Sequence, residues 1–128
     1  MMSLLIDLQP GADSQRVTVS GRLDTHTYDQ LDQALVPTLA DGGVTTLVLD
    51  LGGLEYISSA GIRSIFKARK ALAARGGRVL VANPQPQIRK VFDMVKAVPM
   101  NEIFASTEEA DAYLDAMQRK VLQGDDED

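Results

Sequence analysis

The chain has 128 residues, of which 45% are hydrophobic and 24% are charged, with a formal net charge of -5 at pH 7. This length is typical of one domain and allows a sizeable core without disulfides or metal. The absence of cysteine and the single histidine exclude a disulfide framework, a thiolate nucleophile and a His-rich metal site. The acidic balance argues against direct nucleic-acid binding, because that depends on clusters of basic residues.

The two ends of the chain predict its location and its domain limits. The first ten residues contain no basic side chain, and Asp7 interrupts their apolar stretch, so they do not resemble a secretory signal. No apolar run approaches the roughly 20 residues of a membrane span. We therefore expect a cytoplasmic protein without a membrane segment. The acidic run at 124–128 is typical of a solvated end, and we expect a folded domain over 1–120 and an acidic, disordered tail over 121–128.

Five segments have the pattern of β-strands. Partial two-residue alternation in 3–9 and 16–23 predicts two adjacent antiparallel strands. Denser runs of leucine and β-branched residues in 45–51 and 78–82 predict strands that are buried on both faces of a central sheet. A fifth, short strand is expected at 102–105.

Apolar residues at helical spacing predict four helices. The stripes are Tyr28, Leu31, Leu35 and Leu39; Ile62, Ile65, Phe66 and Leu72; Ile88, Val91, Phe92 and Val95; and Tyr113, Leu114, Met117 and Val121. Pro37 would clash with the carbonyl of Gln33 in a regular helix, so we expect the first helix to kink or end early. The predicted fold is one α/β domain with a mixed four- to five-stranded sheet and about four helices, in the order β-β-α-β-α-β-α-β-α, with right-handed crossovers.

Two adjacent serines, Ser58 and Ser59, separate an apolar strand from a basic helix in the run EYISSAGIR at 55–63. A serine at a helix start can accept hydrogen bonds from the free backbone N–H groups, which stabilises the helix by ~1 kcal/mol. We expect the helix to begin within a residue or two of Ser59, and capping then explains one of the two serines. The small residues that follow, Ala60 and Gly61, predict an open hydroxyl at the carboxyl edge of the sheet, where open α/β folds place their sites.

A hydroxyl at a helix start can also carry a phosphate, because the free N–H groups and the helix dipole favour a dianion. Phosphoserine adds roughly -1.5 to -2 charges at neutral pH, which would repel an acidic partner. The following helix carries Arg63, Lys67 and Lys70 as a basic stripe. Such a stripe is either solvated surface or a surface that recognises an acidic partner. Capping and phosphorylation are therefore both open at this point.

The segments VSGRLDTHT and LVLDLGGLEYISSAGIRSIFKARKALAARGGRVLVANPQPQIRKVFDMV resemble the STAS domain of bacterial anti-sigma factor antagonists, also called anti-anti-sigma factors. The resemblance extends from about Leu4 to Met117. Its most specific parts are the run GRLD at 21–24 and the serine pair with the strand before it. The resemblance implies a regulator of transcription that acts by partner switching, without enzyme activity, metal or tightly bound cofactor.

In the family that the chain resembles, a serine or threonine in a D-S-S-G motif is phosphorylated by the partner, an anti-sigma factor that is also a serine kinase. A phosphoserine phosphatase reverses the modification. By position the phosphoacceptor is Ser59, with Ser58 as second choice; Ser58 also replaces the family's preceding aspartate, which leaves less negative charge beside the acceptor. Asp24 is expected close to the acceptor. The expected partner contacts are Asp24, Thr25, Ser58, Ser59, Gly61, Ile62 and Arg63.

Two alternatives remain. A serine hydrolase would use Ser59 as nucleophile, His26 as base and Asp24 or Asp29 to orient the base, but Ile57 stands where a nucleophile elbow needs glycine. The other alternative keeps the fold and drops the modification: a non-phosphorylated STAS binding subunit of a transport or sensory complex.

Overall fold

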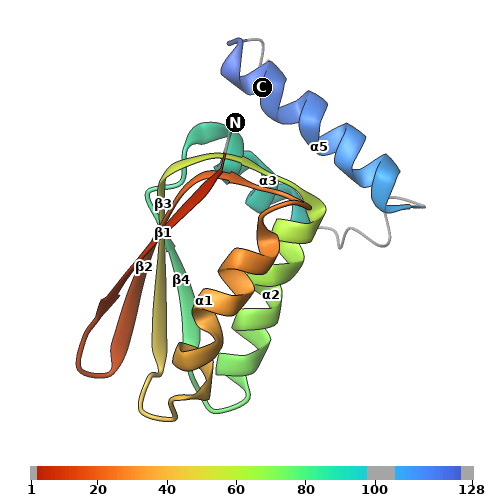
Figure 1. Ribbon diagram of the computed structural model, residues 1–128. Coiled ribbons are helices and arrows are strands. Elements are labelled where there is room, and N and C mark those ends of the chain that lie inside the picture. Colours follow the sequence, from red (N-terminus) through yellow and green to blue (C-terminus); the bar gives the residue numbers. More distant parts are fainter. Residues whose placement is uncertain (1–2, 98–105, 125–128) are drawn as a thin grey trace.

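The computed structural model describes residues 3–97 and 106–124, which form a sheet with helices on one face and at one end (Figure 1). The elements, in chain order, are β1 (Leu4–Pro10), β2 (Ser14–Leu23), α1 (Tyr28–Ala40), β3 (Thr46–Ile57), α2 (Ser59–Ala73), β4 (Arg78–Ala82), α3 (Pro86–Ala97) and α5 (Thr107–Leu122). The predicted α/β class and the order of these elements are confirmed. The fifth strand expected at 102–105 lies outside the described residues.

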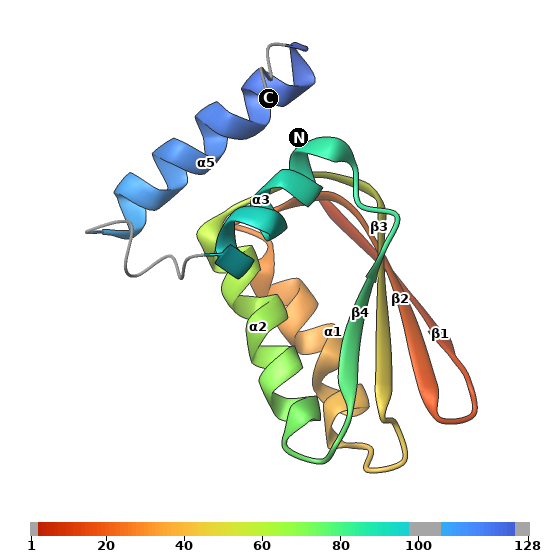
Figure 2. The same cartoon turned by 180° about the vertical axis from the view of Figure 1, so that it is seen from behind.

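The sheet is mixed, as predicted, with the strand order β1-β2-β3-β4. β1 pairs antiparallel with β2, with Leu4 opposite Gly21 and Pro10 opposite Gln15. β2 pairs with β3, and β3 with β4, in parallel. Parallel neighbours need a crossover connection, and α1 and α2 supply the two crossovers. Both helices lie side by side on the same face of the sheet (Figures 1 and 2). The prediction that β3 and β4 are buried on both faces was therefore wrong: burial alternates along β3, and Leu80 and Val81 of β4 are 43% and 39% exposed.

β3 continues to Ile57, so its predicted end at Leu51 was wrong. The glycine pair after Leu51 indicated a turn, but β2 keeps pairing across it through register shifts, with Ser20 opposite Gly53 and Leu23 opposite Ile57. A Cβ at Gly53 would overlap the Ser20 side chain, so glycine allows the two strands to approach here. The longer β3 and the end of β2 therefore reach the same edge of the sheet.

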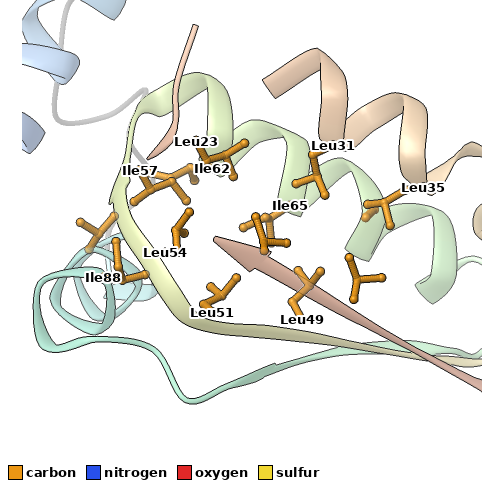
Figure 3. Close-up of a cluster of buried hydrophobic side chains, with 14 of the residues drawn as sticks. Leu23, Leu31, Leu35, Leu49, Leu51, Leu54, Ile57, Ile62, Ile65 and Ile88 are labelled. Atoms are coloured by element: carbon orange, nitrogen blue, oxygen red, sulfur yellow. The ribbon is translucent and has the colours of Figure 1, made fainter. Parts of the chain in front are cut away.

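The core between the sheet and the two crossover helices is aliphatic (Figure 3). Its fully buried members include Leu23, Leu31, Leu35, Leu47, Leu49, Leu51, Leu54, Ile57, Ile62 and Leu72. Burying a side chain of this size stabilises the fold by about 1.5–3 kcal/mol. The aliphatic members of the first two predicted helical stripes are thus buried or half-buried against the sheet, whereas the aromatic members Tyr28 and Phe66 are exposed, each at 37%. None of the helices in the described ranges is both long and apolar enough to span a bilayer.

α1 runs through Pro37 to Ala40, so the early end expected at Pro37 did not occur. Proline lacks one N–H group, and in the last turn this costs only the hydrogen bond to the carbonyl of Gln33. The carbonyl of Pro37 accepts a hydrogen bond from the N–H of Asp41 at 3.1 Å. The Arg75 guanidinium donates to four carbonyls near this helix end, those of Thr38, Leu39, Asp41 and Val44. These bonds hold the helix end in spite of the proline.

Candidate functional site

Residues 57–60, which we call the serine junction, link the end of β3 to the start of α2. Ser58 is the N-cap residue, with φ -101 and ψ 177, and Ser59 is the first residue of the helix. The cap position is therefore taken by Ser58, the first of the two serines. The N–H of Ser58 donates to the carbonyl of Leu23 at 2.9 Å. This bond ties the serine junction to the end of β2 and to the loop that follows it.

Both serine hydroxyls are buried. Ser58 is 3% exposed and Ser59 is 0% exposed, and neither Oγ has a hydrogen-bond partner among the described residues. Neither side chain caps α2, and the prediction of an open hydroxyl was wrong for this structure. A buried hydroxyl without a partner costs about 1–3 kcal/mol and is uncommon in folded proteins. The two buried hydroxyls therefore destabilise the folded state, and helix capping does not offset this.

Helix α5 covers the serine junction, and its side chains bond the junction's backbone. Asp111 Oδ1 accepts a hydrogen bond from the N–H of Ser59 at 2.9 Å. Gln118 Oε1 accepts from the N–H of Ile57 at 3.0 Å, and Gln118 Nε2 donates to the carbonyl of Ile57 at 2.8 Å. Leu114 is fully buried between these two polar residues. Both views show α5 beyond the N-terminal end of α2 (Figures 1 and 2).

Asp111 and Gln118 are site residues that the sequence prediction missed. Gln118 occupies a position in the apolar stripe of its helix, four residues after Leu114, and is 1% exposed. A glutamine inside such a stripe could have signalled a buried polar contact, because buried polar groups need partners. Nothing in the spacing of Asp111 points to the serine junction.

The loop after β2 carries Asp24 and Thr25, and it is held by its own hydrogen bonds. Asp24 Oδ1 accepts from the N–H of His26 at 2.9 Å, and Asp24 Oδ2 lies 3.5 Å from Nε of Arg22. The hydroxyl of Thr27 donates to the carbonyl of Arg22 at 2.7 Å and accepts from the N–H of Asp24 at 2.9 Å. Thr25 is exposed. The loop thus presents Thr25 at the edge of the sheet and keeps the Asp24 carboxylate turned toward its own backbone.

The hydrolase alternative requires a hydrogen bond between the nucleophile and its base. His26 is exposed, and Ser59 Oγ has no partner in the part of the chain that the structure describes. The arrangement is thus not that of a serine nucleophile with its base.

No group of three or more acidic or histidine side chains within 3–97 and 106–124 could hold a metal ion.

A groove of about 470 Å³ extends from the serine junction along α1 and α2. It is lined by Thr25, Tyr28, Asp32, Ala60, Arg63, Ser64 and Lys67. Two of the expected partner contacts, Thr25 and Arg63, therefore lie in one groove. All three residues of the predicted basic stripe, Arg63, Lys67 and Lys70, are exposed, and Lys67 pairs with Asp32 at 3.2 Å. The groove offers a docking surface of mixed polarity beside the buried serines.

Two other expected partner contacts lie beneath the surface. Ile62 is 1% exposed and belongs to the core. A Cβ at Gly61 would lie 2.7 Å from Cγ of Leu23 and 2.9 Å from Cγ1 of Ile57. Figure 3 shows Leu23, Ile57 and Ile62 gathered at the start of α2. Glycine at position 61 therefore lets α2 pack closely on the ends of β2 and β3.

α5 also brings negative charge to this edge of the sheet. The Arg22 guanidinium lies 4.1 Å from the centre of the Tyr56 ring, a cation–π contact. Burial raises the pKa of Tyr56 above its ordinary value of 10.0, and the carboxylates of Asp115 and Asp111 raise it further. A phenolate is thus disfavoured here by two acidic residues of α5.

The family model described as the STAS domain matches residues 10–110. The chain belongs to the STAS domain family. An anti-sigma F factor antagonist of Lysinibacillus sphaericus is 33% identical over 76 residues, which are 59% of this chain and 65% of that relative. An anti-sigma F factor antagonist of Paenibacillus polymyxa is 29% identical over 112 residues, 84% of this chain and 96% of that relative. The match thus spans 65% of the first relative's length and nearly all of the second's.

Two solved structures of the Bacillus anti-sigma factor antagonist SpoIIAA share this fold. The unphosphorylated form is 26% identical, with a TM-score of 0.61, over 70% of this chain and 83% of that one. The phosphorylated form is 26% identical, with a TM-score of 0.62, over 74% of this chain and 86% of that one. The family and the fold predicted from the sequence are therefore confirmed.

Proposed function

We propose that this STAS domain is an anti-sigma factor antagonist that switches partners through phosphorylation of Ser59. It binds an anti-sigma factor with serine kinase activity while Ser59 is free, and it is released when that partner phosphorylates Ser59. A phosphoserine phosphatase returns it to the binding state. The observation that carries the proposal is the position of Ser59 as the first residue of α2, at the sheet edge shared with the β2 loop. The names of the relatives support it, and SpoIIAA is described in both phosphorylation states.

The chemistry of α2 suits a phosphate at this place. The helix has 15 residues and no acidic residue in its first turn. Its N-terminal N–H groups and dipole therefore favour a dianion on Ser59. The modification changes the charge of the docking surface by roughly -1.5 to -2 without breaking the helix. Its effect on a partner is then electrostatic.

The proposed partner surface is the groove and the serine junction beside it. Thr25 and Arg63 contribute exposed side chains, and Asp24, Ser58, Ser59, Gly61 and Ile62 lie around or beneath them. The protein is proposed to work in the cytoplasm as a protein-binding regulator. It has no enzyme activity in this proposal, needs no cofactor, and makes no direct contact with nucleic acid.

Intact mass spectrometry tests the proposal directly. The purified protein is incubated with ATP and with each kinase-like anti-sigma candidate from the same genome. We expect one candidate to add one phosphate, which peptide mapping locates on Ser59. Ser58→Ala should still be modified, whereas Ser59→Ala should not be modified and should bind that candidate whether or not ATP is present. A phosphate that maps to Ser58 would move the acceptor by one residue, and a wild-type chain left unmodified by every candidate would contradict the proposal.

A second candidate function is a non-phosphorylated binding subunit of a transport or sensory complex. It is favoured by the burial of Ser59, which is 0% exposed beneath α5. Such a subunit would bind its partner with the same affinity in the wild type and in Ser59→Ala, with or without ATP. A loss of wild-type binding on addition of ATP would exclude it.

A further inference from the structure

A carboxylate already occupies the N-terminus of α2. Asp111 Oδ1 accepts the N–H of Ser59, the first helical residue, at 2.9 Å. The helix supplies no acidic residue of its own in this turn, so the carboxylate comes from α5. Helix N-termini stabilise one nearby anion through the same free N–H groups that bind phosphate. The Asp111 carboxylate and a phosphate on Ser59 would therefore compete for one place.

The docked position of α5 also blocks access to the Ser59 hydroxyl, the proposed phosphoacceptor. Gln118 bonds both the N–H and the carbonyl of Ile57, at 3.0 and 2.8 Å, and Ala110 and Leu114 are buried on the same helix. Ser59 is 0% exposed under this cover, with its hydroxyl unbonded. Phosphoryl transfer requires the attacking hydroxyl to reach the γ-phosphate in line. The hydroxyl cannot be reached while α5 is in place.

The charges near the serine junction oppose a second anion. Asp111 bonds the junction directly, and Asp115 and Asp111 both lie near enough to Tyr56 to disfavour a phenolate there. Arg22 lies on this side of the junction, but it pairs with Asp24 at 3.5 Å and stacks on Tyr56. A phosphoserine dianion at position 59 would thus meet the Asp111 carboxylate, and like charges in contact repel.

We propose that α5 is a lid on the phosphorylation site: its contacts through Asp111 and Gln118 hide Ser59 from the kinase, and a phosphate on Ser59 excludes the lid. This inference rests on the proposed function of Ser59. It makes α5 the element that sets how fast the domain is switched off. The kinase acts on the fraction of molecules in which α5 has left the serine junction, because only that fraction presents the hydroxyl.

Amide hydrogen exchange on the full chain tests the lid without a kinase. The N–H groups of Ile57 and Ser59 donate to side chains of α5, so they report its docking. Asp111→Asn and Gln118→Ala should each speed exchange at these two amides by about tenfold. Glu108→Gln is the matched control, because it removes a charge from the same helix at an exposed position, three residues before Asp111; it should leave exchange at both amides unchanged. Wild-type exchange at both amides in Asp111→Asn and Gln118→Ala would overturn the lid.

A negative group at position 59 tests the competition. Ser59→Asp should speed exchange at Ile57 by about tenfold relative to Ser59→Ala, because the new carboxylate faces Asp111. Adding Asp111→Asn to Ser59→Asp should recover part of this protection, since the repulsion is removed. Cooperative unfolding of each variant shows that it is folded. If Ser59→Asp disturbs the fold, the exchange rates of Asp111→Asn, which is altered at a half-buried residue, still test whether α5 protects the serine junction. Equal exchange in Ser59→Asp and Ser59→Ala would overturn the competition.

The kinase assay completes the test. With a kinase that modifies the wild type, Asp111→Asn and Gln118→Ala should be phosphorylated about tenfold faster, and Glu108→Gln at the wild-type rate. Equal rates in wild type and variants would overturn the lid and leave the proposed function standing. If no kinase modifies even these two variants, the proposed function fails and the regulatory role of α5 fails with it. Amide exchange then shows separately whether α5 contacts the serine junction, because it needs no kinase.

Discussion

Two helical regions of this STAS domain contact the sheet in different ways. α1 and α2 cover one face through aliphatic side chains such as Leu31, Leu35 and Ile65, all at most 3% exposed. α5 meets the sheet's edge through Ala110, Leu114 and Met117, and through polar bonds to the serine junction. The first contact depends on area removed from water, and the second depends in addition on the direction and charge of a few groups.

The difference in chemistry implies a difference in how each contact can be controlled. Hydrophobic burial is non-directional and adds up over many side chains, each worth about 1.5–3 kcal/mol. A hydrogen bond to a charged group is worth about 1.5–3 kcal/mol net and depends on the charge itself. A single phosphate can therefore reverse the contact of α5, whereas it would leave the packing of α1 and α2 intact. This suits a regulatory site, because the packing of α1 and α2 keeps the domain folded whether or not α5 is in contact with the serine junction.

The largest expected effect is a cavity in the aliphatic core. Leu49→Ala should lower the free energy of unfolding by about 2–5 kcal/mol, because Leu49 is fully buried in β3. Urea denaturation measures it. Leu80→Ala is the control: Leu80 lies on the neighbouring strand β4 and is 43% exposed, so its loss should cost less than about 1 kcal/mol. Similar losses in both variants would contradict the core as described.

Leu114→Ala separates the two regions, since Leu114 is as fully buried as Leu49. Hydrogen exchange in this variant should speed up in α5 and at the serine junction, while β2 and β3 keep their protection. Local and global openings are resolved in this way. Lost protection throughout the sheet would show instead that α5 belongs to one cooperative core with α1 and α2.

Gly61→Ala should break the close approach of α2 to the ends of β2 and β3, which belongs to the first of the two regions. Its Cβ would meet Leu23 and Ile57, at 2.7 and 2.9 Å, and both side chains are fully buried and cannot give way freely. Overpacking of this kind costs about 1–3 kcal/mol, again read from urea denaturation. Gly42→Ala is the control, because a Cβ at Gly42 meets nothing within 4 Å. If Gly61→Ala is as stable as Gly42→Ala, the glycine is not needed for packing.

The fold could be predicted from the sequence because the local spacing of apolar residues indicates the order of the strands and helices. The stripe of Leu31 and Leu35 and the alternation around Val17 and Val19 each mark one element and its buried face. The end of β3 could not be predicted. Pairing with β2 carries the strand past a glycine pair that by itself favours a turn, and such pairing overrides local propensity.

The candidate site was predicted only in part for a related reason. The position of Ser59 at a helix start follows from neighbouring residues, but the bonds to its backbone and to that of Ile57 come from α5, about fifty to sixty residues away along the chain. An amphipathic helix shows in its sequence that it packs, not where it packs. Asp111 and Gln118 therefore have meaning only once the tertiary structure joins them to Ile57 and Ser59.

The smallest predicted effect is a change in the titration of Tyr56, which lies where the two regions meet. Burial raises the pKa of Tyr56 above 10.0, and Asp115 and Asp111 raise it further. Asp115→Asn removes the larger of the two carboxylate effects, so the pKa of Tyr56 should fall toward its ordinary value. Tyrosine ¹³C NMR over a pH series measures this. Glu108→Gln should leave the titration unchanged, and an unchanged titration in Asp115→Asn would contradict the position of α5 beside Tyr56.

The same shift sets a pH dependence with a definite sign. Because the pKa of Tyr56 is raised in the folded chain, its contribution to the free energy of unfolding is fully present below pH 10. It is lost as the pH rises from there through the raised pKa, since the unfolded chain gives up its phenolic proton first. The pH range between 10 and the raised pKa, over which this stability is lost, should be narrower in Asp115→Asn. It should be narrower still in Leu114→Ala, because releasing α5 removes the carboxylates and part of the burial together. A pH range that is the same in all three proteins would mean that the aliphatic core, and not α5, sets the environment of Tyr56.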